Sequence, residues 1–429
     1  MLHFGWFLSY TVQSWGRTWS GRGGEEWTQP EQYIEAARAL ERAGFDYMMF
    51  EDGSFIPDVY GSSQDWALRN AAAAPKLDPL PLLATIARET DNIGLIGTVT
   101  TSWYPPFFAA RLLTTLDHLT KGRVGMNLVT AHNIRSAENY GLQDDWDHDK
   151  RYARADEWMQ VVSQLWDAWE PGAIVNDPVT RTYVDPSKVH PINFEGKYYR
   201  SRGPLNCQPG PQRRPVICQA GGSPTGREFG ARHADTIIAQ ARGVERMKEY
   251  RDDISRRLIA NGRKPQDVKV LFICDVHVFA TMAEADAFRA VRENDAALNL
   301  ELNLASLSFA SGIDGSTLDL DAPFPELTTN NAQSVLQHYL IGSEGKTVRE
   351  VMSKPISQSI SFTGTPESIA DEMADIAAQT GADGFLIGGG IERRQVAEVS
   401  DGLGAELRRR GLARDSYDWP TFRENLFAF

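Results

Sequence analysis

Short apolar runs alternate with longer segments of helical periodicity along almost the whole chain, and this alternation constrains the fold most. Each run is nearly continuous in apolar residues, as expected of a parallel strand covered on both faces. The runs are Leu2–Leu8, Tyr47–Phe50, Ile93–Thr98, Val124–Val129, Pro215–Ala220, Thr236–Ala239, Val268–Phe279 and Gly384–Ile387. Eight such strand–helix units in order predict an α/β fold, a (β/α)8 TIM barrel.

The segments between the runs carry helix start and stop signals. The first begins after Pro30 and stops before Gly44. The expected helices are Glu31–Ala43, Pro79–Glu89, Pro106–Leu119, Asp149–Trp169, Gly243–Asn261 and Val396–Arg410.

Two stretches interrupt this regular spacing. Residues 170–214 and 283–360 are rich in Pro, Asn, Asp and Gly, which predicts insertions after strands 4 and 7. The second should be partly helical, over Glu284–Leu300 and Asn331–Gly342. The aromatic C-terminal arm, Tyr417–Phe429, should pack on the barrel or on a second subunit. We therefore expect residues 1–429 to form a single barrel domain.

Composition excludes several classes of protein. The net charge of −13 argues against nucleic acid as a partner, because neutralising phosphates needs a basic face. Apolar runs are too short to span a membrane, and the N-terminus lacks the basic region of a signal peptide. Cys207, Cys218 and Cys274 are scattered, which suits a reducing cytoplasm and makes neither a zinc site nor a disulfide framework.

The segment Gln219–Glu228 carries the strongest local signal for a ligand. It places a Gly-Gly-Ser turn between a strand and a helix, with Ser223 as N-cap and Pro224 at the first helical position. Backbone N–H groups and a hydroxyl at the positive end of a helix can bind an anion such as phosphate. The alternative is an ordinary capped turn that binds no ligand.

In a barrel of this kind the active site lies at the carboxyl ends of the strands. The residues at these ends should therefore converge on one mouth. They are Glu51-Asp52, Thr98 to Trp103, Thr130 to Asn133 and Gly221 to Ser223. They offer hydroxyls, amides and aromatic rings but no facing pair of acids, which suits a polar planar cofactor better than glycoside hydrolysis.

Several segments, in order along nearly the whole chain, resemble the bacterial luciferase-like, reduced-flavin-dependent monooxygenases. The resemblance is greatest to the subgroup of the nitrilotriacetate, EDTA and dibenzothiophene-sulfone monooxygenases. The matching segments are Phe50–Asp52, Gly97–Ser102, Gly122–Thr130, Glu138–Gly141, His148–Tyr152, Arg202–Asn206, Gln219–Arg227 and Arg423–Leu426. The resemblance implies that reduced FMN binds in the barrel mouth as a co-substrate.

The resemblance also implies roles at the ring end of the flavin. Asp52 and Thr98 match the positions near the ring and the ribityl chain. Taken without the resemblance, Asp52 could equally be a turn residue before Gly53, and Thr98 could satisfy buried backbone groups.

At the phosphate end, His148 and Tyr152 match the pair that reaches the ribityl chain and the phosphate. They are four residues apart and so share one helix face. Ser223 matches the phosphate ligand, with Gly222 supplying a backbone N–H. The alternative for His148 and Tyr152 is a capping and packing pair.

This chain departs from the family where substrate should bind. No histidine occurs in Tyr10–Arg17, and Ala131-His132 replaces the usual Ser and Trp. His132 is the candidate catalytic residue, as a hydrogen-bonding or proton-moving group; the alternative is a structural histidine. The candidate substrate-binding residues are Ser14, Trp15, Phe55, Trp103 and Asn133.

The reaction that the resemblance implies inserts one atom of O2 into a small organic molecule. The eleven tryptophans favour an apolar or aromatic substrate. A separate NAD(P)H:flavin reductase would supply reduced FMN, because no Gly-x-Gly-x-x-Gly unit is present for a second nucleotide. We expect a homodimer or homotetramer. A deazaflavin-dependent oxidoreductase and a non-catalytic flavin-binding protein remain as alternatives.

Overall fold

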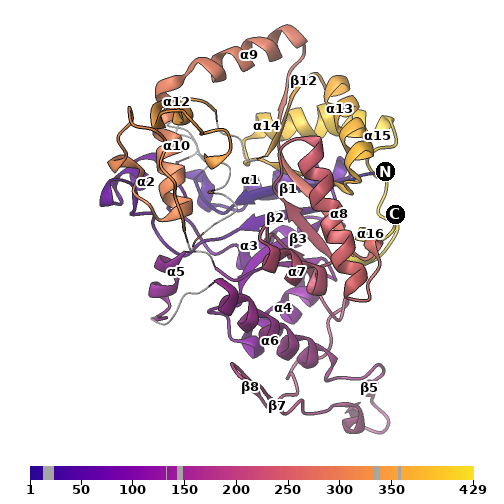
Figure 1. Ribbon diagram of the computed structural model, residues 1–429. Coiled ribbons are helices and arrows are strands. Elements are labelled where there is room, and N and C mark those ends of the chain that lie inside the picture. The colour runs from indigo at the N-terminus through magenta and orange to yellow at the C-terminus, as the bar shows by residue number, and fades with distance from the viewer. Residues whose placement is uncertain are drawn as a thin grey trace.

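A parallel barrel forms the centre of the molecule in the computed structural model, which describes residues 1–12, 24–131, 133–142, 148–329, 331, 336, 339–355 and 359–429 (Figure 1). Its strands are β1 His3–Ser9, β2 Tyr47–Glu51, β3 Gly94–Thr100, β4 Val124–Val129, β9 Val216–Gln219, β10 Thr236–Ala239, β11 Lys269–Val278 and β13 Gly384–Gly388. Each pairs with the next in this order, and β13 returns to pair with β1. Every predicted strand is present, and the (β/α)8 barrel is confirmed.

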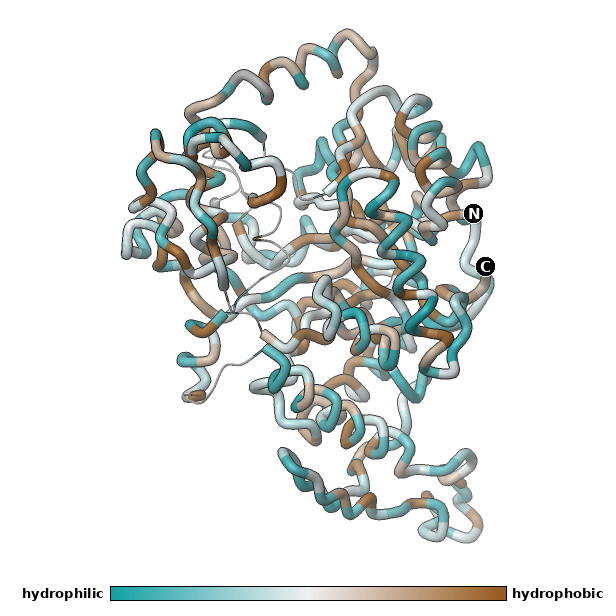
Figure 2. The backbone as a smooth tube through the Cα atoms, viewed as in Figure 1, coloured by the Kyte–Doolittle hydropathy of each residue, from teal (hydrophilic) through white to brown (hydrophobic). Residues whose placement is uncertain are grey.

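Helices cover the outside of the barrel. They are α1 Glu31–Arg42, α3 Pro79–Ala87, α4 Pro106–Leu119, α6 His148–Asp167, α7 Pro224–His233, α8 Val244–Ala260, α13 Pro366–Thr380, α14 Arg393–Ala397 and α15 Gly404–Arg409. A π-helical segment, Glu398–Leu403, joins the last two, so the predicted helix over 396–410 is interrupted. Figure 2 shows hydrophobic residues along the central strands and hydrophilic ones along outer helices such as α8.

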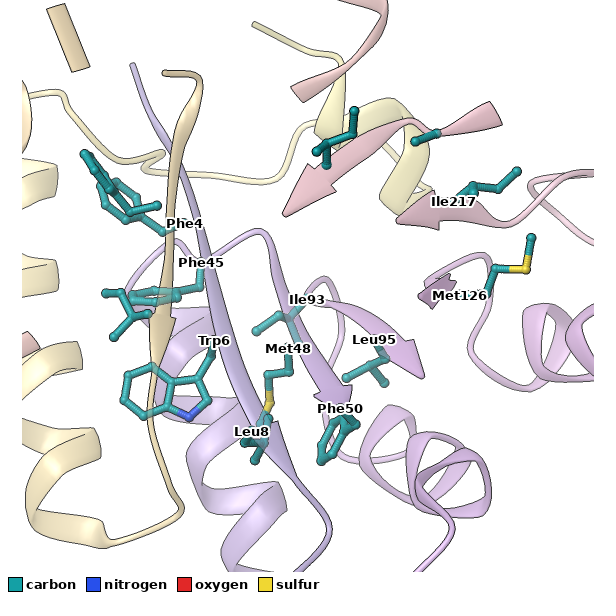
Figure 3. Close-up of a cluster of buried hydrophobic side chains, with 14 of the residues drawn as sticks. Phe4, Trp6, Leu8, Phe45, Met48, Phe50, Ile93, Leu95, Met126 and Ile217 are labelled. Carbon is teal, nitrogen blue, oxygen red and sulfur yellow. The ribbon is translucent and has the colours of Figure 1, made fainter. Parts of the chain in front are cut away.

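Alternation along the strands builds two separate cores. In β2, Met48 and Phe50 belong to the large cluster between strands and helices, whereas Tyr47 and Met49 belong to a smaller cluster inside the barrel. This is the period of two expected when both faces of a strand are buried. Figure 3 shows Met48 and Phe50 beside other members of the outer cluster.

The C-terminal arm closes the end of the barrel opposite the mouth. Its helix α16, Phe422–Leu426, places Phe422 in the inner core, with its ring centroid 5.8 Å from that of Tyr47. Gly94 makes this possible, because a Cβ there would lie 2.6 Å from the Phe422 ring. Packing on the barrel, one of the two alternatives for the arm, is therefore what this chain adopts.

A buried ionic network ties the arm to the first strands. The Asp46 carboxylate accepts hydrogen bonds from Arg414 and from the Phe4 N–H (2.8 Å), and it lies 3.0 Å from His3 Nδ1. Although burial opposes the shift, His3 and Arg414 hold the pKa of Asp46 below its ordinary value. The network couples the arm to the stability of the whole barrel.

The first insertion forms two small hairpins that project from the barrel (Figure 1). They pair β5 Ile174–Asp177 with β6 Thr182–Val184, and β7 Phe194–Glu195 with β8 Arg200–Ser201.

The second insertion contains α9 Met282–Asn294, α10 Ala296–Ser311 and α12 Val348–Met352. It has a small core of its own, which includes Leu304, Leu307 and Met352. A further strand, β12 Ile360–Gly364, follows it and pairs with the second half of β11 outside the closed barrel.

The remaining helical elements are short. Two α-helices lie in the segments after β2 and β4, α2 Asp65–Asn70 and α5 Ile134–Asn139. Single turns of 3₁₀ helix occupy Glu26–Thr28, Tyr60–Ser62, Pro186–Lys188, Pro265–Asp267 and Gly315–Thr317. Across the described ranges, no helix combines the length and the apolar character needed to cross a bilayer.

Candidate functional site

Two adjoining cavities lie at the carboxyl ends of the barrel strands. The larger has a volume of about 540 Å³ and the smaller about 230 Å³. Both are lined by strand-end residues, among them Glu51, Val129, Ala131, Ala220, Gly222 and Gln240. Asp52, Thr98, Asn133 and Gly222, predicted to meet at one mouth, all line the smaller cavity.

The Gly-Gly-Ser turn lies in the larger cavity as a strand-to-helix connection. Ser223 is the N-cap of α7, and its Oγ accepts a hydrogen bond of 3.1 Å from the Gly226 N–H. Gly221 packs tightly on this helix, because a Cβ there would lie 2.7 Å from Gly226 Cα. The predicted local structure is confirmed, and the turn presents the amino end of α7 to the cavity.

His148 and Tyr152 lie together beside this turn. Their ring centroids are 5.1 Å apart, and His148 Nε2 lies 3.2 Å from Ser223 Oγ. Burial raises the pKa of Tyr152, although hydrogen bonds to neighbours that include Ser223 oppose the shift. The structure therefore brings the three predicted phosphate-end side chains into one cluster.

Charges of both signs lie near the cluster, because Asp149 Oδ1 is 3.0 Å from His148 Nδ1 and two arginines are close by. Arg151 is buried and lines the larger cavity. Arg227 donates a 3.0 Å hydrogen bond to the Gly222 carbonyl, and its guanidinium lies 4.4 Å from the centre of the Tyr250 ring. Arg227 thus holds the turn in place, a role that the sequence analysis missed. A basic residue three positions into a helix that follows such a turn is the signal that could have found it.

In the smaller cavity, the hydroxyl of Thr98 makes two hydrogen bonds within the protein. It donates to the Phe50 carbonyl at 2.8 Å and accepts from Asn127 Nδ2 at 3.0 Å. Thr98 therefore satisfies a buried backbone carbonyl, as the alternative to a flavin contact predicted. It also lines the smaller cavity.

Asn127 is a candidate that the sequence analysis missed. It is buried in β4 and lines the smaller cavity, and its Oδ1 has no hydrogen-bond partner among the described residues. Buried acceptors are nearly always satisfied, so this oxygen is available to a bound donor. An amide within the apolar run of a central strand was the signal in the sequence.

Asp52 lines the smaller cavity with an unusual carboxyl group. Burial raises its pKa to about 6, with contributions from Glu51 and Asp78, while Lys76 and the Gly53 N–H oppose the shift. Asp52 also acts as a turn residue, the alternative given in the sequence analysis, because its Oδ1 accepts a 2.8 Å hydrogen bond from the Gly53 N–H.

The raised pKa of Asp52 predicts a pH-dependent stability. The folded protein holds this proton more tightly than the unfolded chain, so the stabilisation is complete at low pH and is lost as pH rises through about 6. Between about pH 4 and pH 7, the wild type should lose roughly 2 kcal/mol more stability than Asp52→Asn. Urea unfolding of both proteins across this range measures the difference, and parallel curves would contradict the prediction.

Three of the predicted substrate-side residues lie around the cavities. Phe55 and Asn133 line both, and Trp103 lines the smaller one. Asn133 also caps α5, accepting a 2.8 Å hydrogen bond from the Arg135 N–H. Ser14, Trp15 and the candidate catalytic residue His132 lie outside the described residues.

An ion pair and a side-chain amide also line the site. Lys76 Nζ lies 2.6 Å from Glu51 Oε2, which also accepts from the Ser9 hydroxyl. Gln240 follows β10 and lines both cavities, and no hydrogen bond joins its side chain to another described residue. The sequence analysis missed Gln240 and Lys76, since neither belongs to a recognisable motif.

The residues present fit an FMN. The Ser223 hydroxyl and the His148 imidazole meet at the amino end of α7, and the Arg151 guanidinium group belongs to the same cavity lining, a set of groups that suits a phosphate dianion. Asn127 offers an unsatisfied acceptor in the adjoining cavity, where a ring with N–H groups would lie.

Comparison with known proteins agrees with this geometry. The profile of the family described as luciferase-like monooxygenase matches residues 2–384. The chain is 34% identical to the long-chain alkane monooxygenase of Geobacillus thermodenitrificans, over 94% of this chain and 88% of that protein. It is 34% identical to the nitrilotriacetate monooxygenase component A of Aminobacter aminovorans, over 93% of this chain and 90% of that protein.

A solved structure extends the likeness to the whole fold. The dimethyl-sulfide monooxygenase of Hyphomicrobium sulfonivorans superimposes with a TM-score of 0.89 at 32% identity, covering 100% of this chain and 92% of that chain. Sequence, barrel and strand-end site thus agree, and the chain belongs to the luciferase-like monooxygenase family.

Proposed function

We propose that this chain is the oxygenase of a two-component monooxygenase, which uses reduced FMN and O2 to insert one oxygen atom into a small organic substrate. The observation that carries the proposal is the cluster of Ser223, His148 and Tyr152 at the amino end of α7, beside a cavity at the strand ends. Relatives of similar length are named monooxygenases, and one is named as component A.

Reduced FMN supplies the electrons that activate O2. In the proposal, Ser223, His148 and Arg151 bind its phosphate, with Gly222 contributing a backbone N–H. Tyr152 orients the ribityl chain, and Asn127 accepts a hydrogen bond from the ring. Asp52, with its raised pKa, holds a proton at the edge of the ring below about pH 6. The surrounding walls exclude water from the reacting atoms.

On the substrate side, the proposal gives Phe55, Trp103, Asn133, Ser14 and Trp15 contacts with the organic molecule. His132 moves a proton or donates a hydrogen bond during oxygen transfer. The chain beside it supports this placement, because Ala131 lines both cavities and has a positive φ of 58° that turns the backbone at the mouth.

The two histidines should separate in a kinetic experiment. His148→Ala should weaken FMN binding first, with oxygenation recovering at saturating flavin. His132→Ala should spare flavin affinity and lower product yield, with more of the consumed O2 released as hydrogen peroxide. A positioned proton donor typically contributes about 10²–10⁴-fold. Coupling efficiency plotted against flavin affinity should place the variants apart, and a common position would show that the roles are wrong.

The proposal includes a flavin reductase as partner, a cytoplasmic location and a homodimer or homotetramer. Free thiols at all of the cysteines support a reducing compartment. The experiment follows NADH oxidation with protein and FMN, before and after a flavin reductase is added. The protein alone should not sustain turnover, and the reductase should start substrate-dependent oxygen uptake. Robust NADH oxidation by the isolated protein would contradict the proposal.

The same assay distinguishes the alternatives. A deazaflavin-dependent oxidoreductase would reduce its substrate without consuming O2 and would bind the deazaflavin more tightly than FMN. A non-catalytic flavin-binding protein would bind FMN and yield no product with any substrate. Neither alternative accounts for relatives named as monooxygenases along nearly the whole chain.

A further inference from the structure

The larger cavity is built by two parts of the chain that are distant in sequence. One wall is formed by the barrel ends and the Gly-Gly-Ser turn. The other is formed by the segment from Phe55 to Ala73 together with α10 of the second insertion, which contributes Leu302, Ala305 and Phe309. We call the space next to this second wall the outer half of the cavity.

The second wall is held by specific contacts. The Phe55 and Phe309 rings stack with centroids 5.6 Å apart and an interplanar angle of 12°. Trp66 Nε1 donates a 2.7 Å hydrogen bond to Glu301 on α10. Because these contacts bridge the barrel loop and the insertion, the outer half keeps a defined shape.

The charged side chains that line the larger cavity come from residues outside the second wall. His148 lies 3.2 Å from Ser223, and Arg151 follows His148 by three residues on α6. Glu51 and Lys76 form an ion pair with each other at 2.6 Å. Among the described residues, those that line the outer half carry alkyl, aromatic, hydroxyl or amide groups and no charge.

A charged ligand placed in the outer half would lose its hydration, and the described residues of the second wall offer it no partner of opposite charge. That cost is large for a carboxylate, whereas an apolar body gains from burial against Phe55, Ala305 and Phe309. The relatives are named for substrates as different as an alkane, a sulfide and an aminopolycarboxylate, so their names leave the substrate class open.

We propose that the outer half of the larger cavity binds an uncharged, mainly apolar organic molecule, and that α10 determines which molecules fit. This inference rests on the proposed function, which assigns the side of the cavity formed by the barrel ends and the Gly-Gly-Ser turn to the flavin. Added volume at Ala305 on α10 should enter the cavity, because this residue is buried and lines the space. Phe309 limits the size of the ligand from the side of the stacked pair.

Binding is measured without turnover, so that it does not depend on oxygenation. The neutral dye Nile red is bound to the protein saturated with FMN. It is then displaced with neutral aromatic sulfones, thioethers and medium-chain alkanes, each paired with its carboxylated analogue. Neutral members should displace the dye at least about tenfold more strongly than their carboxylated partners. Equal or stronger displacement by the carboxylates would overturn the inference.

Three variants locate the site. Ala305→Trp should weaken dye binding at least about tenfold with unchanged FMN affinity. Leu298→Trp, on the same helix but exposed and outside the cavity lining, should leave both unchanged. Phe309→Ala enlarges the cavity and should admit bulkier neutral ligands. It provides a test of the site even if Ala305→Trp does not fold.

The failures of the two proposals are distinguishable. Unchanged dye binding in both Ala305→Trp and Phe309→Ala would overturn the inference while leaving FMN binding intact. Dye binding that follows the prediction in a protein that does not bind FMN would instead contradict the proposed function.

Discussion

Arg414→Ala is expected to lower the free energy of unfolding by about 3–5 kcal/mol, since removing one partner of a buried ion pair leaves the other charge uncompensated. The side chains of Arg414 and Asp46 are 5% and 2% exposed. Arg414 also donates to the Asn425 carbonyl at 2.9 Å, so the substitution frees the C-terminal arm as well. Chemical denaturation measures the effect where unfolding is two-state.

The matched control is an ion pair on the surface. Arg38 pairs with Glu89, and their side chains are 50% and 46% exposed. Arg38→Ala should therefore cost less than about 1 kcal/mol. Similar losses for the two substitutions would show that the network beneath the barrel does not stabilise it in the way described.

Ser223→Asp is expected to weaken FMN binding by roughly a thousandfold. A carboxylate about 4 Å from a phosphate charge costs about 4 kcal/mol at the effective dielectric of a partly buried site. Riboflavin lacks the phosphate and should lose far less affinity. Calorimetric titration of both ligands measures the difference, and equal losses would contradict the assignment of Ser223 to the phosphate.

The control for this substitution is Ser223→Asn. Ser223 is the N-cap of α7, accepting from Gly226 N–H, and Asp and Asn are both favourable N-caps. Both variants should therefore keep the helix, and only the aspartate adds a charge. FMN affinity should fall much further in Ser223→Asp than in Ser223→Asn.

Much of this fold could be predicted because its strands are buried on both faces and read as continuous apolar runs. The strand β12 was not predicted, since Ile360–Gly364 is short and its face is only partly apolar. The hairpins of the first insertion were missed for the same physical reason. Strands of two to four half-exposed residues are too short to show a recognisable alternation of apolar and polar residues in the sequence.

At the site, local motifs could be predicted and long-range packing could not. The Gly-Gly-Ser turn and the spacing of His148 and Tyr152 are set by residues close in sequence. The wall formed by Phe55 and Phe309 joins residues more than 250 positions apart, and only the fold brings them together. Asn127 could not be predicted for another reason. Its Nδ2 donates to Thr98 while its Oδ1 has no partner among the described residues, and this arrangement depends on the register of β3 and β4.

The measurement that tests the central claim most directly follows oxygen itself. Purified protein is mixed with reduced FMN, isotopically labelled O2 and a panel of neutral organic molecules, and the products are analysed by mass spectrometry. The account predicts one labelled oxygen atom in the product when reduced FMN is supplied, and no product with oxidised FMN alone. Product formed without labelled oxygen, or formed equally well without reduced FMN, would contradict it.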